Sequence, residues 1–245
     1  MDSAHLIFLS LAIGVIAFLY SSVGHAGASG YIATMTLFGL ATTVIRPTAL
    51  VLNILVASIG AFQFWRAGHF AWKLFWPFAV LSIPAAYLGG YLQPSASVLR
   101  TLIGLVLLFS VARFIFRRED PPKVEQPSVP TAIGLGAGIG FLSGLTGTGG
   151  GIFLTPLLLF CHWAYIRQAA AVSALFILVN SISGLSGYFA ANQSIPWLGI
   201  LLTPAAAIGG ILGSHLGSRH FPVRIISMLL ATVLVIAGMK LLFTR

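Results

Sequence analysis

Long apolar segments alternate with short polar connections along almost the whole chain. The apolar runs fall at about 5–22, 30–43, 47–65, 72–92, 97–116, 130–146, 150–163, 167–190, 196–216 and 221–243. A helix needs about 20 apolar residues to cross the hydrocarbon core of a bilayer, and most of the runs reach that length. Strands of a membrane barrel would alternate apolar and polar positions, which these runs do not. The pattern predicts an all-α, polytopic transmembrane helical bundle.

Two glycine-rich breaks interrupt this pattern. The first break spans residues 21–30 (SSVGHAGASG), and the second spans residues 143–151 (SGLTGTGGG). They lead into the two short runs, 30–43 and 150–163, which we therefore expect to be half-helices or re-entrant arms. Irregular backbone cannot face lipid, so both breaks must be buried in protein or line a wet cavity. We expect them to face one another and to form the working site.

A polar stretch with four prolines, residues 117–130, divides the chain nearly in half. Landmarks recur in the same order on its two sides: Ile45-Arg46 and Ile166-Arg167, then Pro84–Gly90 and Pro204–Gly210, then Val98–Arg100 and Pro222–Arg224. An internal repeat of this kind is typical of transporters. We predict a first transmembrane repeat at 1–116, a Pro-rich cytoplasmic linker at 117–130 and a second repeat at 131–245.

The relative orientation of the two repeats depends on the number of crossings. Five crossings per half, or three crossings plus a re-entrant hairpin, would invert the second half, whereas four plus four would leave the halves parallel. With the linker in the cytoplasm, inversion places nine basic residues inside and four outside, against eight and five for the parallel arrangement. Because cytoplasmic loops carry the excess of Lys and Arg, the count favours inversion by one residue.

Composition narrows the classes of function. Hydrophobic residues make up 58% of the 245 residues and charged residues 7%, against about a quarter charged in a soluble domain. The net charge of +9 comes from basic residues scattered between apolar runs, which argues against nucleic acid as a partner. The four acids, Asp2, Glu119, Asp120 and Glu125, all lie outside the apolar runs, so no carboxylate is placed to relay protons or bind a multivalent cation.

Candidate metal and targeting signals are weak. The single cysteine, Cys161, excludes an intrachain disulfide, and with His162 it would supply only two metal ligands. We predict no metal site and no cofactor. The apolar start at residues 5–20 lacks a basic flank and an obvious cleavage site, so we expect it to be a first span.

The second break, Gly144–Gly151 followed by Thr155-Pro156, its weaker copy at Gly24–Gly30 and the repeated architecture together resemble the TauE/SafE family of sulfite and organosulfonate transporters. The resemblance covers essentially the whole chain. It implies a multi-pass protein of the cytoplasmic (inner) membrane that moves a small sulfur-containing anion such as sulfite, thiosulfate or a sulfonate. The first copy departs from the pattern, because His25, Ala26 and Ala28 stand where the second has Thr148, Gly149 and Gly151.

The chemistry of the breaks suits an anion. Successive N–H groups of a glycine-rich turn can converge on an oxyanion, and a helix that starts after the turn adds the positive end of its dipole. Nearby hydroxyl groups could donate further hydrogen bonds to sulfonyl oxygens. We predict that the substrate is bound by Gly24, His25, Gly27, Ser29, Asn53, Thr146, Gly147, Thr148, Gly149, Gly150, Gly151 and Ser173.

Several of these side chains have alternative interpretations. His25 could donate to the anion or carry a coupled proton, and it could equally be a neutral, hydrogen-bonded histidine. Arg46 and Arg167 could attract anions at a vestibule, although interfacial snorkelling is the favoured interpretation of each. Small residues also let helices pack closely, an interpretation that we prefer for the glycines at 134, 136, 138 and 140.

We therefore expect a secondary transporter of a small sulfur-containing anion, held between the two breaks and moved by rocking or gating of one half. The alternatives are a channel or facilitator for another small oxyanion or carboxylate, and a membrane subunit of a larger complex. An enzyme is not expected, because the spans contain no carboxylate pair, Ser/His/Asp set or metal cluster. Proton coupling and homo-oligomerisation stay open.

Overall fold

The computed structural model describes residues 3–22, 24–92, 94–95, 97–99, 101–105, 123–192 and 197–217. The long elements of this part are all helices: α1 (Ser3–Ser22), α2 (Ala28–Leu37), α3 (Thr42–Arg66), α4 (Trp72–Tyr91), α6 (Val129–Thr146), α7 (Gly151–Phe160), α8 (Ile166–Asn192) and α9 (Trp197–Gly217). The all-α prediction is confirmed there. The predicted span at 221–243 and most of the span at 97–116 lie outside the described residues.

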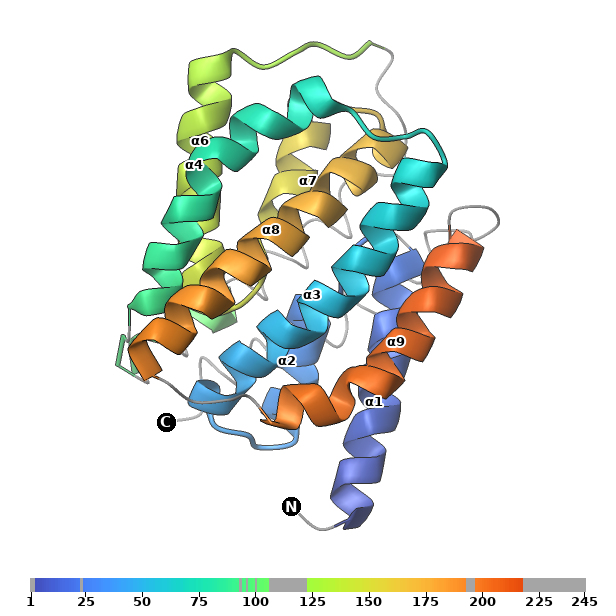
Figure 1. Ribbon diagram of the computed structural model, residues 1–245, viewed down its shortest axis with the longest axis vertical. Coiled ribbons are helices and arrows are strands. Elements are labelled where there is room, and N and C mark those ends of the chain that lie inside the picture. The colour runs from blue at the N-terminus through green and yellow to red at the C-terminus, as the bar shows by residue number, and fades with distance from the viewer. Residues whose placement is uncertain are drawn as a thin grey trace.

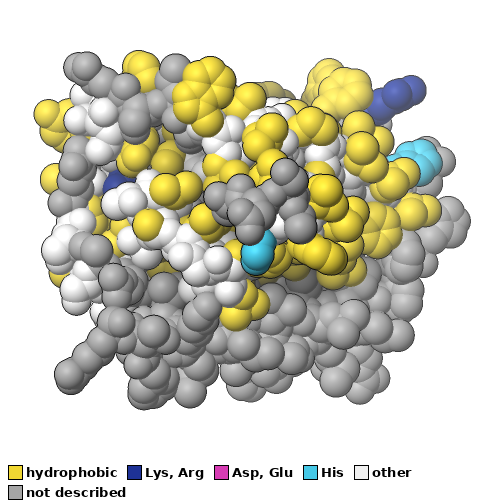
Figure 2. Space-filling view, turned by 90° about the horizontal axis from the view of Figure 1, so that it is seen from below, with side chains coloured by type: hydrophobic (Ala, Val, Ile, Leu, Met, Phe, Trp, Pro, Cys, Tyr) yellow, Lys and Arg dark blue, Asp and Glu magenta, His cyan; other side chains and the backbone are white. Residues whose placement is uncertain are grey.

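Six of these helices, α1, α3, α4, α6, α8 and α9, are long and apolar enough to cross a membrane. Many large apolar side chains on them are exposed at the surface of the protein, including Phe8, Leu88 and Ile208. Figure 2 views the molecule from the lower end of Figure 1, and its coloured surface is largely hydrophobic with little Lys or Arg. Exposed apolar side chains along helices of membrane-spanning length are what contact with lipid requires, and the chain is a multi-pass membrane protein.

The two glycine breaks are real interruptions between helices. α1 ends at Ser22 and the ten-residue α2 begins at Ala28, whereas α6 ends at Thr146 and the ten-residue α7 begins at Gly151. Left-handed glycines make each interruption, with Gly27 and Gly150 as the N-caps of the two short helices. Glycine adopts a positive φ without the steric penalty of a Cβ atom. The prediction of two half-helices after the breaks is confirmed.

The same order of a long helix, a break, a short helix and two long helices occurs twice. α3 and α8 pack against each other, α4 packs on α6 and α8, and α9 packs on α1 and α3. α4 of the first half therefore covers α6, the first helix of the second half, and α9 covers α1 (Figure 1). In Figure 1, α1 runs upward from the N-terminus, whereas α6 runs downward from the linker. Inversion of the halves stays a prediction with which these directions agree.

The glycines of α6 divide into two groups. A Cβ on Gly136, Gly140 or Gly144 would collide with backbone oxygens of Phe78, Ser82 and Ala86 in α4, respectively. Among the described residues, a Cβ on Gly134 or Gly138 would meet no atom within 4 Å. Glycines four residues apart share one face of a helix, which lets α4 and α6 approach closely. The packing interpretation is confirmed for the glycines at 136 and 140 and is wrong for those at 134 and 138.

The structure corrects the register of the repeat by about one helical turn. α3 and α8 begin at Thr42 and Ile166, which are 124 residues apart, whereas Arg46 and Arg167 are only 121 apart. Likewise, Gly89 packs on Phe141 of α6. The motifs pair Gly89 with Gly209, but the glycine that makes the corresponding contact, with Phe18 of α1, is Gly213. The matched motifs in the sequence therefore mark the repeat without marking equivalent positions in space.

Candidate substrate site at the second glycine break

The second break presents a turn of left-handed glycines to the N-terminus of α7. Gly147, Gly149 and Gly150 have φ angles of 80°, 74° and 81°. Among the described residues, the backbone N–H groups of residues 148–152 form no hydrogen bond, since the first bonds into the turn come from Phe153 and Leu154 to Gly150. Unpaired N–H groups at a helix N-terminus, together with the helix dipole, favour an anion.

Buried polar side chains surround this turn. A Cβ on Gly149 would lie 2.8 Å from Asn53 Nδ2 of α3 and 2.9 Å from Ser181 Oγ of α8. Both side chains are fully buried, and neither the amide of Asn53 nor the hydroxyl of Ser181 has a hydrogen-bond partner. Ser143 Oγ and Asn180 Oδ1 are also buried without a partner. Because an unsatisfied buried polar group costs about 1–3 kcal/mol, this cluster is suited to bind a polar ligand.

Arg46 holds the second break in place from α3. Its guanidinium donates to the carbonyl oxygens of Gly144 (3.1 Å), Leu92 (3.0 Å), Gly89 (2.6 Å) and Gly90 (2.6 Å). These carbonyls belong to the last turns of α6 and α4, where the helix itself supplies no donor. Only 3% of the Arg46 side chain is exposed, so the snorkelling interpretation is wrong for this residue.

The predicted counterpart of Arg46 lies in a different environment. Arg167 is exposed at the second residue of α8, whereas Arg46 is the fifth residue of α3. The packing identifies another equivalent: a Cβ on Gly147 would meet Arg46, and a Cβ on Gly24 would meet Ala170, which is 124 residues after Arg46. The first break therefore has an alanine where the second has a buried arginine.

His25 connects the first break to the second half of the chain. Its Nε2 lies 2.9 Å from Thr155 Oγ1 of α7, and Thr155 donates to Ser173 Oγ of α8 over 2.7 Å. Thr155 has one hydroxyl proton, so it accepts from His25, and this assigns a hydrogen to Nε2. All three side chains are buried. The structure thus brings two predicted site residues, His25 and Ser173, into one hydrogen-bonded chain.

Tyrosines fill the remainder of the first break. Tyr20 Oη bonds to Ser29 Oγ at 2.8 Å, and Tyr31 Oη donates to the carbonyl of Ala26 at 2.6 Å. Gly27 provides room for the Tyr31 ring, since a Cβ there would lie 2.8 Å from a ring carbon. The predicted ligand Ser29 is therefore engaged with a side chain of its own half.

The threonines of the second break are also engaged with protein groups. Thr146 Oγ1 donates to the carbonyl of Leu142 at 2.7 Å and bonds to Thr148 Oγ1 at 3.0 Å. Because Thr146 gives its proton to Leu142, the proton of Thr148 is directed to Thr146. Their hydroxyl protons therefore point to protein oxygens. The donors that lack partners are the N–H groups and the side chains of Asn53, Ser143 and Ser181.

The contacts that connect the two breaks run mainly through side chains of α7 and α8. A Cβ on Gly151 would lie 3.7 Å from the Cβ of Ser173, which is bonded to Thr155 and thereby to His25. Asn53 and Ser181 lie on the other side of the turn, at Gly149. The proposed facing of the breaks stays a prediction.

Sequence reasoning missed Thr155, Ser143 and Ser181 as individual site residues. Ser173, Ile177 and Ser181 are four residues apart on α8 and share one face, and this face meets Gly149 and Gly151. The helical spacing could have indicated Ser181, but only the packing shows which face of α8 turns toward the break.

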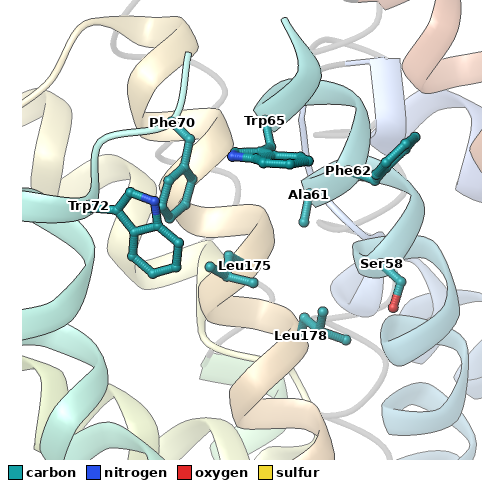
Figure 3. Close-up of a pocket in the computed structure, with 8 residues that line it drawn as sticks. All are labelled: Ser58, Ala61, Phe62, Trp65, Phe70, Trp72, Leu175 and Leu178. Atoms are coloured by element: carbon teal, nitrogen blue, oxygen red, sulfur yellow. The ribbon is translucent and has the colours of Figure 1, made fainter. Parts of the chain in front are cut away.

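An open pocket of about 290 Å³ lies elsewhere, between the C-terminal half of α3 and α8. Its walls are mainly aromatic and aliphatic, with Trp65, Phe70 and Trp72 at one end and Leu175 and Leu178 from α8 (Figure 3). It contains none of the predicted site residues. Among the described residues, no group of three His, Cys, Asp or Glu side chains is arranged to hold a metal ion.

Comparison with known proteins identifies the family. The sulfite exporter TauE/SafE family matches residues 9–241, which is nearly the whole chain. The chain belongs to the TauE/SafE family. A similar protein is the probable membrane transporter protein y4hK of Sinorhizobium fredii, 40% identical over 247 residues that cover 96% of this chain and 97% of the relative.

More distant TauE/SafE-like relatives are also named as transporters. The probable membrane transporter protein MJ0441 of Methanocaldococcus jannaschii is 26% identical and covers 80% of this chain and 77% of its own length. The probable membrane transporter protein YjnA of Bacillus subtilis is 24% identical over an alignment that covers 98% of this chain and 100% of the relative. No solved structure matches the chain. The family and these names agree on a membrane transporter.

Proposed function

We propose that this TauE/SafE protein is a secondary transporter of a small sulfur-containing anion, a class that includes sulfite, thiosulfate and organosulfonates, in the cytoplasmic membrane. The observation that carries the proposal is the second break, where unpaired N–H groups of α7 meet the buried, partnerless side chains of Asn53 and Ser181. Sulfur oxyanions carry several oxygens that accept hydrogen bonds at once, which these converging donors can supply.

The architecture supports alternating access. Two halves with the same order of helices exchange their outer helices, and both breaks are buried between them. We propose that the halves are inverted repeats and that one half rocks against the other around the bound anion. Proton coupling, if present, would use His25, because its hydrogen-bonded chain links the first break to α7 and α8.

The test is a flux measurement on purified protein in liposomes. Radiolabelled sulfite and radiolabelled methanesulfonate are supplied on one side, and uptake is compared with protein-free liposomes and with the Gly149→Val variant. We expect saturable flux of at least one of the two anions in the native protein and none in the variant. Absence of flux with both anions, in protein that is folded and inserted, would falsify the proposal.

A further inference from the structure

The charges around the second break bear on the net charge of the substrate. Arg46 is the only Lys, Arg, Asp or Glu among the buried side chains of the described residues. The side chains nearest to Gly149, those of Asn53, Ile177 and Ser181, are neutral. The charge that an anion meets at this break therefore depends on Arg46 and on the dipoles of the helices that end or begin there.

The guanidinium of Arg46 is hydrogen-bonded to the C-termini of two helices. Its four hydrogen bonds go to carbonyls of the last turns of α4 and α6. Each helix C-terminus carries the equivalent of about half a negative charge, so two of them offset about one positive charge. Arg46 thus cancels the negative pole of α6 at the break, and four of its five N–H groups are used in doing so.

Once the charge of Arg46 is offset by the C-termini of α4 and α6, the positive end of the α7 dipole remains at the second break. A helix N-terminus contributes about half a positive charge. At the first break the positive pole of α2 is offset by the negative pole of α1, which ends there at Ser22. The second break therefore offers a net positive charge of about half a unit, which compensates part of one negative charge. A second negative charge would be uncompensated, and the cost of removing an ion from water grows about fourfold when its charge doubles.

We propose that the second break selects a singly charged sulfur oxyanion, such as a sulfonate or hydrogensulfite, over doubly charged sulfite, sulfate and thiosulfate. This inference rests on the proposed function and narrows its substrate class. Neutral donors then do the recognition: the N–H groups of α7, the amide of Asn53 and the hydroxyl of Ser181.

The first test needs no variant. Flux into proteoliposomes is measured with methanesulfonate, which is a monoanion at all working pH values, and with sulfate and thiosulfate, which are dianions. At roughly pH 8, where an ordinary histidine is neutral, we expect the dianions to move at least about tenfold more slowly. Dianion flux within about twofold of methanesulfonate flux would overturn the inference while leaving the proposed function intact. If no anion moves, the proposed function fails instead.

Sulfite supplies an internal titration, because it gains a proton near neutral pH and becomes hydrogensulfite. The ratio of sulfite flux to methanesulfonate flux should rise as the pH is lowered from roughly 8 to roughly 6, and taking the ratio cancels any titration of His25. A ratio that stays constant or falls would contradict the selection of the monoanion.

A variant test addresses the charge of the site directly. Asn53→Asp keeps the size of the side chain and adds a negative charge, so methanesulfonate flux should fall at least about tenfold below that of Asn53→Ala. Lys73→Gln changes the net charge by the same amount at an exposed position of α4 and should leave flux unchanged. Equal flux in Asn53→Asp and Asn53→Ala would overturn the inference.

Discussion

The two glycine breaks occupy equivalent places in the two halves, yet they are built differently. The second break has three left-handed glycines, a buried arginine against Gly147 and partnerless polar groups around Gly149. The first break has Ala170 against Gly24. Ser29 and His25 are hydrogen-bonded there, whereas Ser21 Oγ is buried without a partner. A repeated scaffold can thus keep one copy for binding and use the other for packing and for linking the halves.

This difference suggests a division of labour. The buried side chains around Gly149 are unsatisfied and suit a ligand, whereas the polar side chains of the first break other than Ser21 are engaged within the protein. Variants at matched positions can test the comparison, and the expected effects range from loss of transport to a change in pH dependence.

The largest effect is expected at Gly149, whose counterpart in the first break is Ala26. A Cβ on Gly149 would lie 2.7–2.9 Å from Ile177, Asn53 and Ser181, and its φ of +74° is strained for other residues. Gly149→Val should reduce flux about 100-fold or more, because the site would be filled and the turn rearranged. Ala26→Gly serves as the matched variant and should retain most of the flux in liposomes. Similar losses in both would contradict the functional difference between the breaks.

Arg46 and Arg167 are the next pair to compare. Arg46→Met would leave four helix-terminal carbonyls without their donor, three of them buried, which should cost about 3 kcal/mol or more of stability. Arg167→Met changes an exposed side chain, and its effect should stay within about 0.5 kcal/mol. Thermal unfolding of both variants in the same detergent gives the comparison. A stable Arg46→Met protein would show that the carbonyls find other donors.

Ser181 offers a test that separates binding from packing. Ser181→Ala removes a hydroxyl that has no partner, so stability should be unchanged or slightly raised. A hydrogen bond to a charged ligand is worth about 1.5–3 kcal/mol, so the KM for methanesulfonate should rise about tenfold. Ser186→Ala is the control, since Ser186 lies exposed on α8 and bonds only to its own helix at Ile182. An unchanged KM in Ser181→Ala would remove Ser181 from the site.

The smallest effect is expected at the first break. His25→Ala breaks the chain to Thr155 and Ser173, and if His25 carries a coupled proton, the pH dependence of methanesulfonate flux should flatten. The rate at its optimum should change only a few-fold, because one buried hydrogen bond contributes about 1 kcal/mol. His215→Ala, at an exposed position of α9, is the control. A pH profile identical to that of the native protein would show that His25 has only a structural role.

The sequence by itself determined the class of protein, the breaks and the short helices that follow them. These features depend on local properties, namely the length of apolar runs and the tolerance of glycine for positive φ angles. The family resemblance, which rests on the same breaks, is confirmed by the match over residues 9–241. Gly147, Gly149 and Gly150 could be singled out for the same reason.

Only the tertiary structure decided how the breaks differ. Arg46 reaches Gly144, 98 residues away, and Asn53 of α3 and Ser181 of α8 both lie against Gly149, contacts that no local pattern specifies. The Ile-Arg motif of the two halves suggested that Arg46 and Arg167 are equivalent, but α8 begins 124 residues after α3 and displaces the second arginine by about one turn. Because a helix turns about 100° per residue, a displacement of three residues is enough to change the neighbours of a side chain. That change of neighbours makes one arginine a buried clamp and leaves the other at the surface.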